Sequence, residues 1–192
     1  INDLIASKGS STFSAITPMG RQHENDREAT AADLKWLADP AEEPEPFGDG
    51  GTKMAWNTFN VVSIYPNGNP VMSDVNQRWV GDCCACAVIA SMAYLYPRFV
   101  KHIIKDNMDK TYTVTMYDPK GKQISVGVGG DYFIGNSGDL GALGGRNKEV
   151  TWATILEKAM IKWNQIYQGS SNVGGIGTEY VSAIFTGDGE SV

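Results

Sequence analysis

Apolar positions with helical spacing mark three segments of the chain. Residues 83–96 are almost all apolar or small and stop at Pro97, which predicts a buried helix. In residues 152–163 the apolar positions recur at steps of three and one, so we predict an amphipathic helix that Thr151 caps. A shorter helix is expected over residues 31–37.

Between the two long helices, polar and apolar residues alternate, which is typical of half-buried strands. Alternation predicts one strand over residues 111–117 and another over 124–128, and the turn formers at 118–121 join them as a hairpin. Residues 52–76 are expected to form loops and short extended pieces, and the glycine-rich stretch 135–147 an irregular segment. The order helix, hairpin, helix favours an α+β fold.

Charge divides the chain into two parts. The 192 residues suffice for a domain with a core, and the net charge of −6 lies entirely in residues 1–50, which carry four basic and ten acidic side chains. We therefore predict an acidic extension or pro-segment with a flexible linker over residues 1–51, followed by a core over 52–192. No basic patch indicates nucleic-acid binding, and no apolar run approaches the roughly 18 to 20 residues of a membrane span.

The candidate chemistry lies where the first long helix begins. Cys83 is expected at the helix N-terminus, where the helix dipole and free backbone N–H groups stabilise a thiolate. Gln77 precedes it by six residues and can direct its amide at an oxyanion formed beside Cys83. Cys84 and Cys86 are expected to be small core residues, because the preceding Gly-Asp and the distance from Gln77 both favour Cys83 as nucleophile.

The cysteine content gives no disulfide framework. All three cysteines lie within four positions, too close together to pair well, and their number is odd. The compartment therefore stays open, with an extracytoplasmic or secreted setting favoured over the cytoplasm.

The string from Gln77 to Cys83, Gln-Arg-Trp-Val-Gly-Asp-Cys, resembles the active-site region of the calpain family of papain-fold cysteine proteases. The resemblance covers about residues 53–188 and implies a papain-like core of which this chain is the first, mainly helical subdomain with a small antiparallel hairpin. Its further matches, in the same order and with similar gaps, are Trp56, the helix Trp152-Ala-Thr-Ile-Leu-Glu-Lys-Ala-Met160, Gly174-Gly175, and Phe185-Thr186-Gly187.

The resemblance implies a cysteine endopeptidase that acts on polypeptide substrates. Cys83 would be the nucleophile, and Gln77 with the Cys83 backbone N–H would form the oxyanion hole. Gly174 and Gly175 match the place where such enzymes pair with an extended substrate backbone, a role that the absence of a side chain suits.

The resemblance also implies a Ca²⁺ site in this half of the core. Asp74 and Glu149 match the family's acidic ligands, with one extra residue of spacing at Glu149, and backbone carbonyls would come from around Asn67 and Asn69. Oxygen ligands of this kind suit Ca²⁺. The alternative is that Asp74 caps a turn and Glu149 begins a helix.

A thiol protease also needs an imidazole, and the chain has only His23 and His102. His23 lies in the polar arm, and His102 is expected to be a structural histidine at or near the surface. We therefore expect the His and Asn of the site to come from elsewhere, either from a second chain produced by processing or from a C-terminal half outside this sequence; a natural half-core without activity is the remaining possibility. Two other functions stay open: a non-catalytic calpain-like module that binds peptide or calcium, and a papain-fold thiol acyltransferase.

Overall fold

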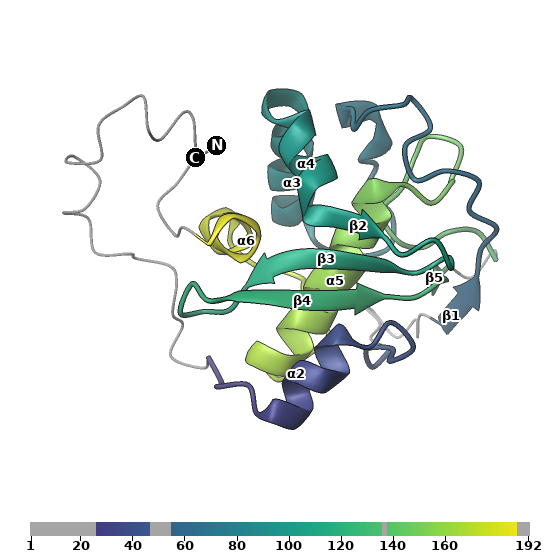
Figure 1. Ribbon diagram of the computed structural model, residues 1–192. Helices are drawn as coiled ribbons and strands as arrows, with labels where there is room; N and C mark the ends of the chain where they lie inside the picture. The colour runs from purple at the N-terminus through teal and green to yellow at the C-terminus, as the bar shows by residue number, and fades with distance from the viewer. Residues whose placement is uncertain (1–25, 47–54, 136–137, 188–192) are drawn as a thin grey trace, which may run out of the picture.

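The structure, a computed structural model, describes residues 26–46, 55–135 and 138–187 (Figure 1). These residues form a mixed helix and strand architecture consistent with the α+β class expected from the sequence. Its helices are α2 (Ala31–Ala38), α3 (Cys83–Leu95), α4 (Pro97–Ile103), α5 (Trp152–Tyr167) and α6 (Thr178–Thr186), with a 3-10 turn η1 (Met72–Asp74); its strands are β1 (Ala55–Thr58), β2 (Ile104–Asp106), β3 (Tyr112–Tyr117), β4 (Gln123–Val128) and β5 (Asp131–Ile134).

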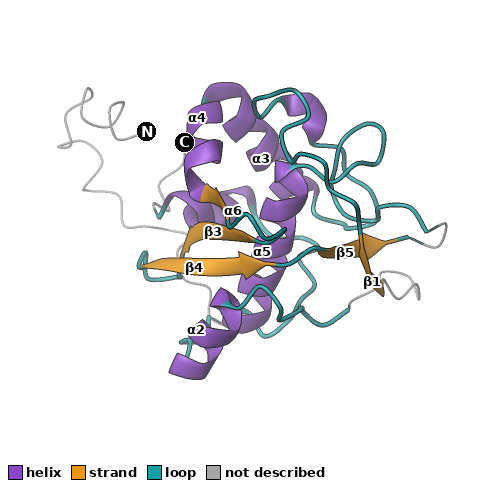
Figure 2. Cartoon of the chain, turned by 45° about the vertical axis from the view of Figure 1, so that its right-hand side comes forward, coloured by secondary structure: helices purple, strands orange, loops and turns teal. Residues whose placement is uncertain are grey.

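The hairpin predicted from alternation is confirmed. Strands β3 and β4 pair antiparallel from Tyr112 opposite Val128 to Tyr117 opposite Gln123, and β2 adds to the other edge of β3. The buried side chains alternate along β3, so one face of this sheet is covered. Figure 1 shows α5 running behind the two strands, and Figure 2 shows the β1–β5 pair set apart from them.

Strand β1 lies in residues 52–76, where short extended pieces were expected, but its pairing with β5, the strand β5 itself and helix α6 were not predicted. Trp56 on β1 stacks on Phe133 of β5 with ring centroids 3.7 Å apart, a contact between segments far apart in the sequence. Helix α6 begins directly after a glycine-rich stretch and buries Val181, Ile184 and Phe185. Short strands and a short helix next to glycines give weak local patterns, because distant partners determine their structure.

Helix α5 is the central element, and every residue in it except Gln165 is buried. Its predicted apolar face is confirmed, with Trp152, Ile155 and Trp163 among the fully covered side chains. Thr151 occupies the N-cap position, and its backbone N–H donates to the Thr154 hydroxyl at 3.0 Å. The polar positions of α5 are buried as well, which the amphipathic pattern did not predict.

Helix α3 ends at Leu95, which confirms the predicted stop before Pro97, and a further helix, α4, begins at that proline. Within the described residues, no single helix has the length and apolar character needed to cross a bilayer. Helices α3 and α4 reach that length and composition only together, as a pair bent by 113°.

The described part of the N-terminal extension packs on the core. Helix α2 confirms the short helix expected at residues 31–37, and its Leu37 is fully buried. The backbone of residues 38–40 lies so close to β4 that a Cβ at Gly127 would come within 2.4 Å of the Ala38 carbonyl oxygen. Residues 39–46 are therefore packed where a flexible linker was expected, and the rest of the predicted extension, 1–25 and 47–51, lies outside the described residues.

Two buried lysines of α5 hold this segment. The Lys158 ammonium forms an ion pair with Glu43 at 2.6 Å and lies over the Trp56 ring. One turn later, the Lys162 ammonium donates to the carbonyl oxygens of Asp39 and Gly127, each at 2.8 Å. The N-terminal segment thus supplies acceptors that two buried cations of the central helix require.

We predict that Glu43→Gln destabilises the protein, because it leaves the Lys158 ammonium buried without its carboxylate. The expected loss in the free energy of unfolding is about 2 kcal/mol, below the range for fully buried pairs because Glu43 is partly exposed. Urea denaturation followed by tryptophan fluorescence measures it. Glu42→Gln, a change at the exposed neighbour, is the matched control and should leave the midpoint unchanged. Equal midpoints for both variants would contradict a stabilising role of the pair.

Candidate active site

Cys83 is the first residue of α3 and is exposed to solvent. Ala85 and Ile89 on the same helix are fully buried and fix α3 against the core. The N-cap residue is Asp82, whose carbonyl accepts the Cys86 N–H at 3.0 Å, so helical bonding starts directly at the cysteine. The thiol therefore lies at the positive end of a 13-residue helix, as the sequence predicted.

The two neighbouring cysteines are in less reactive settings. Burial is the main cause that raises the pKa of the Cys86 thiol, and the Asp82 and Glu157 carboxyls raise it further. Desolvation also raises the pKa of Cys84, with smaller contributions from Cys83 and Glu179. Both environments favour the thiol form, which is the poor nucleophile. Among the three cysteines, the site thus favours Cys83.

Gln77 is exposed and belongs to the loop that leads into α3. Its side-chain Nε2 donates to the Val80 carbonyl at 2.9 Å, which folds the amide back over its own loop. The amide also faces the Asp82 carboxyl, the residue next to Cys83. The structure therefore brings Gln77 into the neighbourhood of Cys83, with one amide hydrogen engaged by the loop.

The glycines predicted to bind substrate backbone lie beside the same loop. A Cβ built on Gly174 would be 3.8 Å from the Gly81 carbonyl oxygen, two residues before Cys83. Gly175 is exposed with φ of +81°, a left-handed conformation that favours glycine, and no atom would obstruct a Cβ there. Cys83, Gln77 and the glycines thus gather at one place although about 100 residues separate the ends of this set.

A buried pair of carboxyls beneath this loop was missed by the sequence analysis. Asp82 and Glu157 are each 1% exposed, and each influences the pKa of the other. The Asp82 Oδ1 accepts from the Cys86 thiol at 3.5 Å, and Glu157 Oε2 accepts the Leu143 N–H at 2.9 Å. Glu157 resembles a solvent-facing helix residue in the sequence, so only the fold reveals it as a neighbour of the candidate nucleophile.

Burial controls the protonation of this pair. Desolvation raises the pKa of Asp82 to about 6 and raises that of Glu157 well above its usual value, with the Asp82 charge as the next cause. Two adjacent buried carboxylates repel each other, which favours the protonated form of each. Burial and repulsion thus oppose a double negative charge below Cys83.

Asp74, a predicted calcium ligand, has a different set of contacts. Its Oδ2 accepts the Trp152 indole N–H at 2.7 Å and the Val71 N–H at 3.2 Å, and its Oδ1 accepts from the Asn67 amide at 3.0 Å. The Asp74 carbonyl accepts the Thr151 hydroxyl at 3.1 Å. Because N–H donors face both carboxylate oxygens, this residue fits a clamp between η1 and the start of α5, and it does not fit a Ca²⁺ ligand in this arrangement.

Glu149, the other predicted acidic ligand, is closer to what a cation needs. Its Oε2 is buried and has no hydrogen-bond partner among the described residues. Its carboxylate lies against Gly145, where a Cβ would come within 2.6 Å of both oxygens. Still, no cluster of three or more His, Cys, Asp or Glu side chains suited to a metal occurs in residues 26–46, 55–135 and 138–187. Asn69 has no contact that bears on the prediction, so the Ca²⁺ site rests on the resemblance alone.

The described residues contain one histidine, His102, which is exposed on α4. Helix α3 separates it from Cys83 and is roughly 18 Å long at 1.5 Å per residue. His102 is thus placed as a surface residue, as the sequence suggested, and His23 lies outside the described residues. The arrangement offers a thiol, an amide and two exposed glycines, with the Gly174 N–H bonded to the Asn172 side chain at 2.9 Å, but it needs an imidazole from elsewhere to act as a protease.

Comparison with models of known protein families gives no match to this chain, and comparison with curated proteins gives none either. The calpain-like assignment therefore stays a prediction that rests on the motifs and on the geometry described above.

We predict that Asp82→Asn removes a pH dependence from stability. The Asp82 carboxyl has a pKa of about 6 in the folded protein and a usual value of 3.8. The stability that its protonated form contributes is therefore complete below pH 4 and is lost as the pH rises through about 6. Relative to wild type, the variant should gain up to about 3 kcal/mol in unfolding free energy between pH 4 and pH 8. Urea titrations across that range measure it.

The matched control for this experiment is Glu42→Gln, because Glu42 is exposed and its neutralisation adds no buried amide. Its stability difference from wild type should vary little with pH. A difference between Asp82→Asn and wild type that is constant from pH 4 to pH 8 would show that the carboxyl does not titrate in this window.

Proposed function

We propose that this chain forms the nucleophile-bearing half of a calpain-like, papain-fold cysteine endopeptidase. The observation that carries the proposal is the gathering of three features at one loop: the exposed Cys83 at the N-terminus of α3, the Gln77 amide, and the exposed glycines Gly174 and Gly175. Each feature serves one step of peptide-bond cleavage, and they come from distant parts of the sequence.

The Cys83 sulfur attacks the carbonyl carbon of the scissile peptide bond, and the carbonyl oxygen becomes an oxyanion. The helix N-terminus stabilises that negative charge, and the Gln77 amide does so once it turns from the Val80 carbonyl and the Asp82 carboxyl toward the oxyanion. An imidazole takes the thiol proton and returns it to the leaving amine, which leaves an acyl group on the sulfur. Water then attacks the thioester and releases the new carboxylate together with the thiol.

The imidazole and its Asn partner belong, in this proposal, to a second chain or to a C-terminal half. Support comes from the open side of α3. Tyr94 and Leu95 on this helix are 73% and 53% exposed. A groove of about 400 Å³ between α3 and α6 begins near the exposed Ala87, one turn after Cys83, and continues to Leu95. A partner that covers this apolar face would also reach Cys83.

The same groove favours the alternative of a non-catalytic peptide-binding module. That function needs no imidazole, and the groove is apolar with an acidic residue, Glu179, on its wall. A papain-fold acyltransferase would use the same thiol with an amine in place of water. Calcium dependence stays a prediction, and none of the steps above involves the metal.

We predict that Cys83 is the thiol that reacts first with iodoacetamide in the folded protein. Peptide mapping by mass spectrometry should show Cys83 modified at least about tenfold faster than Cys86, because Cys83 is exposed whereas Cys86 is partly buried and its raised pKa favours the thiol form. Cys84→Ser is the matched control and should leave the rate at Cys83 unchanged. Faster reaction at Cys84 or Cys86 would reject Cys83 as the nucleophile.

Paired native and denaturing mass spectra test the completed site. The proposal expects a second polypeptide, with the His and Asn, bound to this chain in the native spectrum, and peptidase activity that Cys83→Ala abolishes. A partner whose complex hydrolyses no peptide, with Cys83 unreactive, would favour the binding module. Transfer of the acyl group to an added amine in place of hydrolysis would indicate the acyltransferase.

A further inference from the structure

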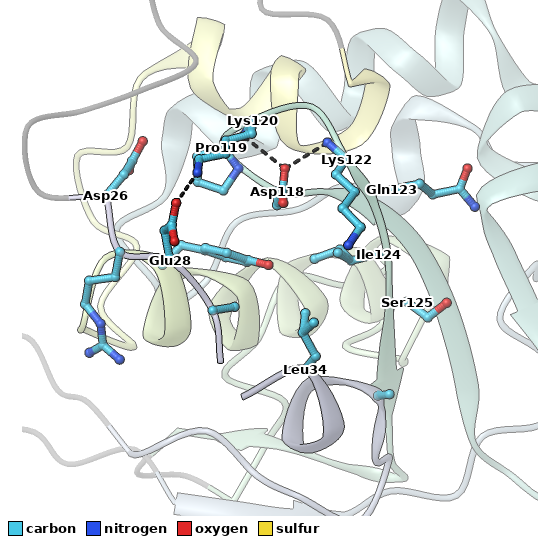
Figure 3. A pocket seen from close by; sticks show the side chains of 14 residues that line it. Asp26, Glu28, Leu34, Asp118, Pro119, Lys120, Lys122, Gln123, Ile124 and Ser125 are labelled. Atoms are coloured by element: carbon cyan, nitrogen blue, oxygen red, sulfur yellow. Dashed lines mark hydrogen bonds and ion pairs between the residues drawn. The ribbon is translucent and has the colours of Figure 1, made fainter. Parts of the chain in front are cut away.

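A second cavity lies away from the Cys83 loop, where α2, the β3–β4 turn and the end of α5 meet (Figure 3). Its volume is about 630 Å³, within the usual range for small-molecule sites. Leu34, Ala38, Pro119 and Ile124 supply apolar wall, and no residue of 72–96 lines it. The cavity is therefore separate from the candidate active site in its lining residues.

The acidic side chains that line this cavity already have partners. Glu28 pairs with Lys120, and the Asp118 carboxylate accepts the backbone N–H groups of Lys120 and Lys122 at 2.9 Å and 2.8 Å. Asp26 accepts the Tyr180 hydroxyl at 2.5 Å. Each carboxylate is thus compensated by donors within the fold.

Two donors on the wall are left over. Within the described residues, no hydrogen bond or ion pair engages the Lys122 ammonium, and Figure 3 shows its side chain extending back over the strand toward Ile124. The Tyr167 hydroxyl is buried and has no partner in the same part of the chain. Burial, with the Asp118 and Asp33 charges, raises the pKa of Tyr167 to about 12, so the hydroxyl stays a donor. A buried donor without an acceptor costs about 1 to 3 kcal/mol.

We propose that this cavity binds a small organic monocarboxylate with an aliphatic body, whose carboxylate accepts from the Lys122 ammonium and the Tyr167 hydroxyl while the body packs on Leu34 and Ile124. A single negative charge fits because Lys122 is the lining lysine without a carboxylate partner among the described residues, whereas Lys120 pairs with Glu28. A multiply charged phosphate would meet these carboxylates with little compensation, and a neutral ligand would leave the ammonium unpaired.

Such a ligand would bridge the N-terminal segment and the core. Leu34 and Ala38 belong to α2, whereas Ile124 is on β4 and Tyr167 ends α5. Binding to the folded form alone would raise the melting temperature with ligand concentration. The inference does not depend on the proposed protease function, since no residue is shared.

Isothermal titration with hexanoate, and with hexanamide as its neutral isostere, tests the proposal on the full chain. Hexanoate should bind at millimolar or tighter affinity, about tenfold more tightly than hexanamide. Lys122→Met should weaken hexanoate by about tenfold, and Tyr167→Phe, which removes only the hydroxyl, by a few fold. Lys105→Met, a change at an exposed lysine outside the cavity, is the matched control and should bind like wild type.

Equal affinity for hexanoate and hexanamide would overturn the proposal, as would unchanged binding in Lys122→Met. Binding of inorganic phosphate as tightly as hexanoate would also overturn it, because it would show a general attraction for anions. Melting curves of the variants without ligand confirm that each one is folded, and Tyr167→Phe should not lower the melting temperature.

Discussion

The fold depends on the burial of α5 all around its axis, including the faces that carry charged side chains. An apolar stripe alone would allow the helix to rest on the β3–β4 sheet and leave its polar positions in water. Here Lys158 and Lys162 are covered, and they stay tolerable only because Glu43 and the carbonyls of Asp39 and Gly127 reach them. The N-terminal segment therefore stabilises the core that it covers, since without it the Lys158 ammonium would keep only the Asp131 carbonyl as acceptor and the Lys162 ammonium only the Gly127 carbonyl.

The same helix connects the core to the candidate active site. Glu157 directly precedes Lys158, and its carboxyl lies with Asp82 under the start of α3. Trp152, the first residue of α5, donates to Asp74 and holds the loop that runs toward Gln77. One helix thus fixes both the loop that carries the amide and the residue that precedes the thiol. A distortion of α5 would therefore change the position of Cys83, even where the altered residue makes no contact with substrate.

The sequence predicted those elements whose partners are close along the chain. The β3–β4 hairpin, α2, α3 with its stop at Pro97 and the apolar face of α5 all follow from local spacing. It did not predict β5, α6 or the partner of β1, because their stability comes from contacts such as Trp56 on Phe133 across many residues. For the site, a motif placed Cys83 and Gln77, but burial of Asp82 and Glu157 could not be predicted, since charged residues are usually exposed.

The buried carboxyl pair resolves an apparent conflict in the proposed active site. An aspartate next to the proposed nucleophile should oppose thiolate formation, and it also places a negative charge at the helix N-terminus where the dipole would otherwise act on sulfur. Burial turns the Asp82 side chain toward Glu157 and Cys86, away from the capping position, and raises the pKa of both acids. The raised pKa values oppose a double negative charge beside the thiol. The backbone N–H groups at the start of α3 also stay uncapped by that side chain, so they remain available to an anion at Cys83.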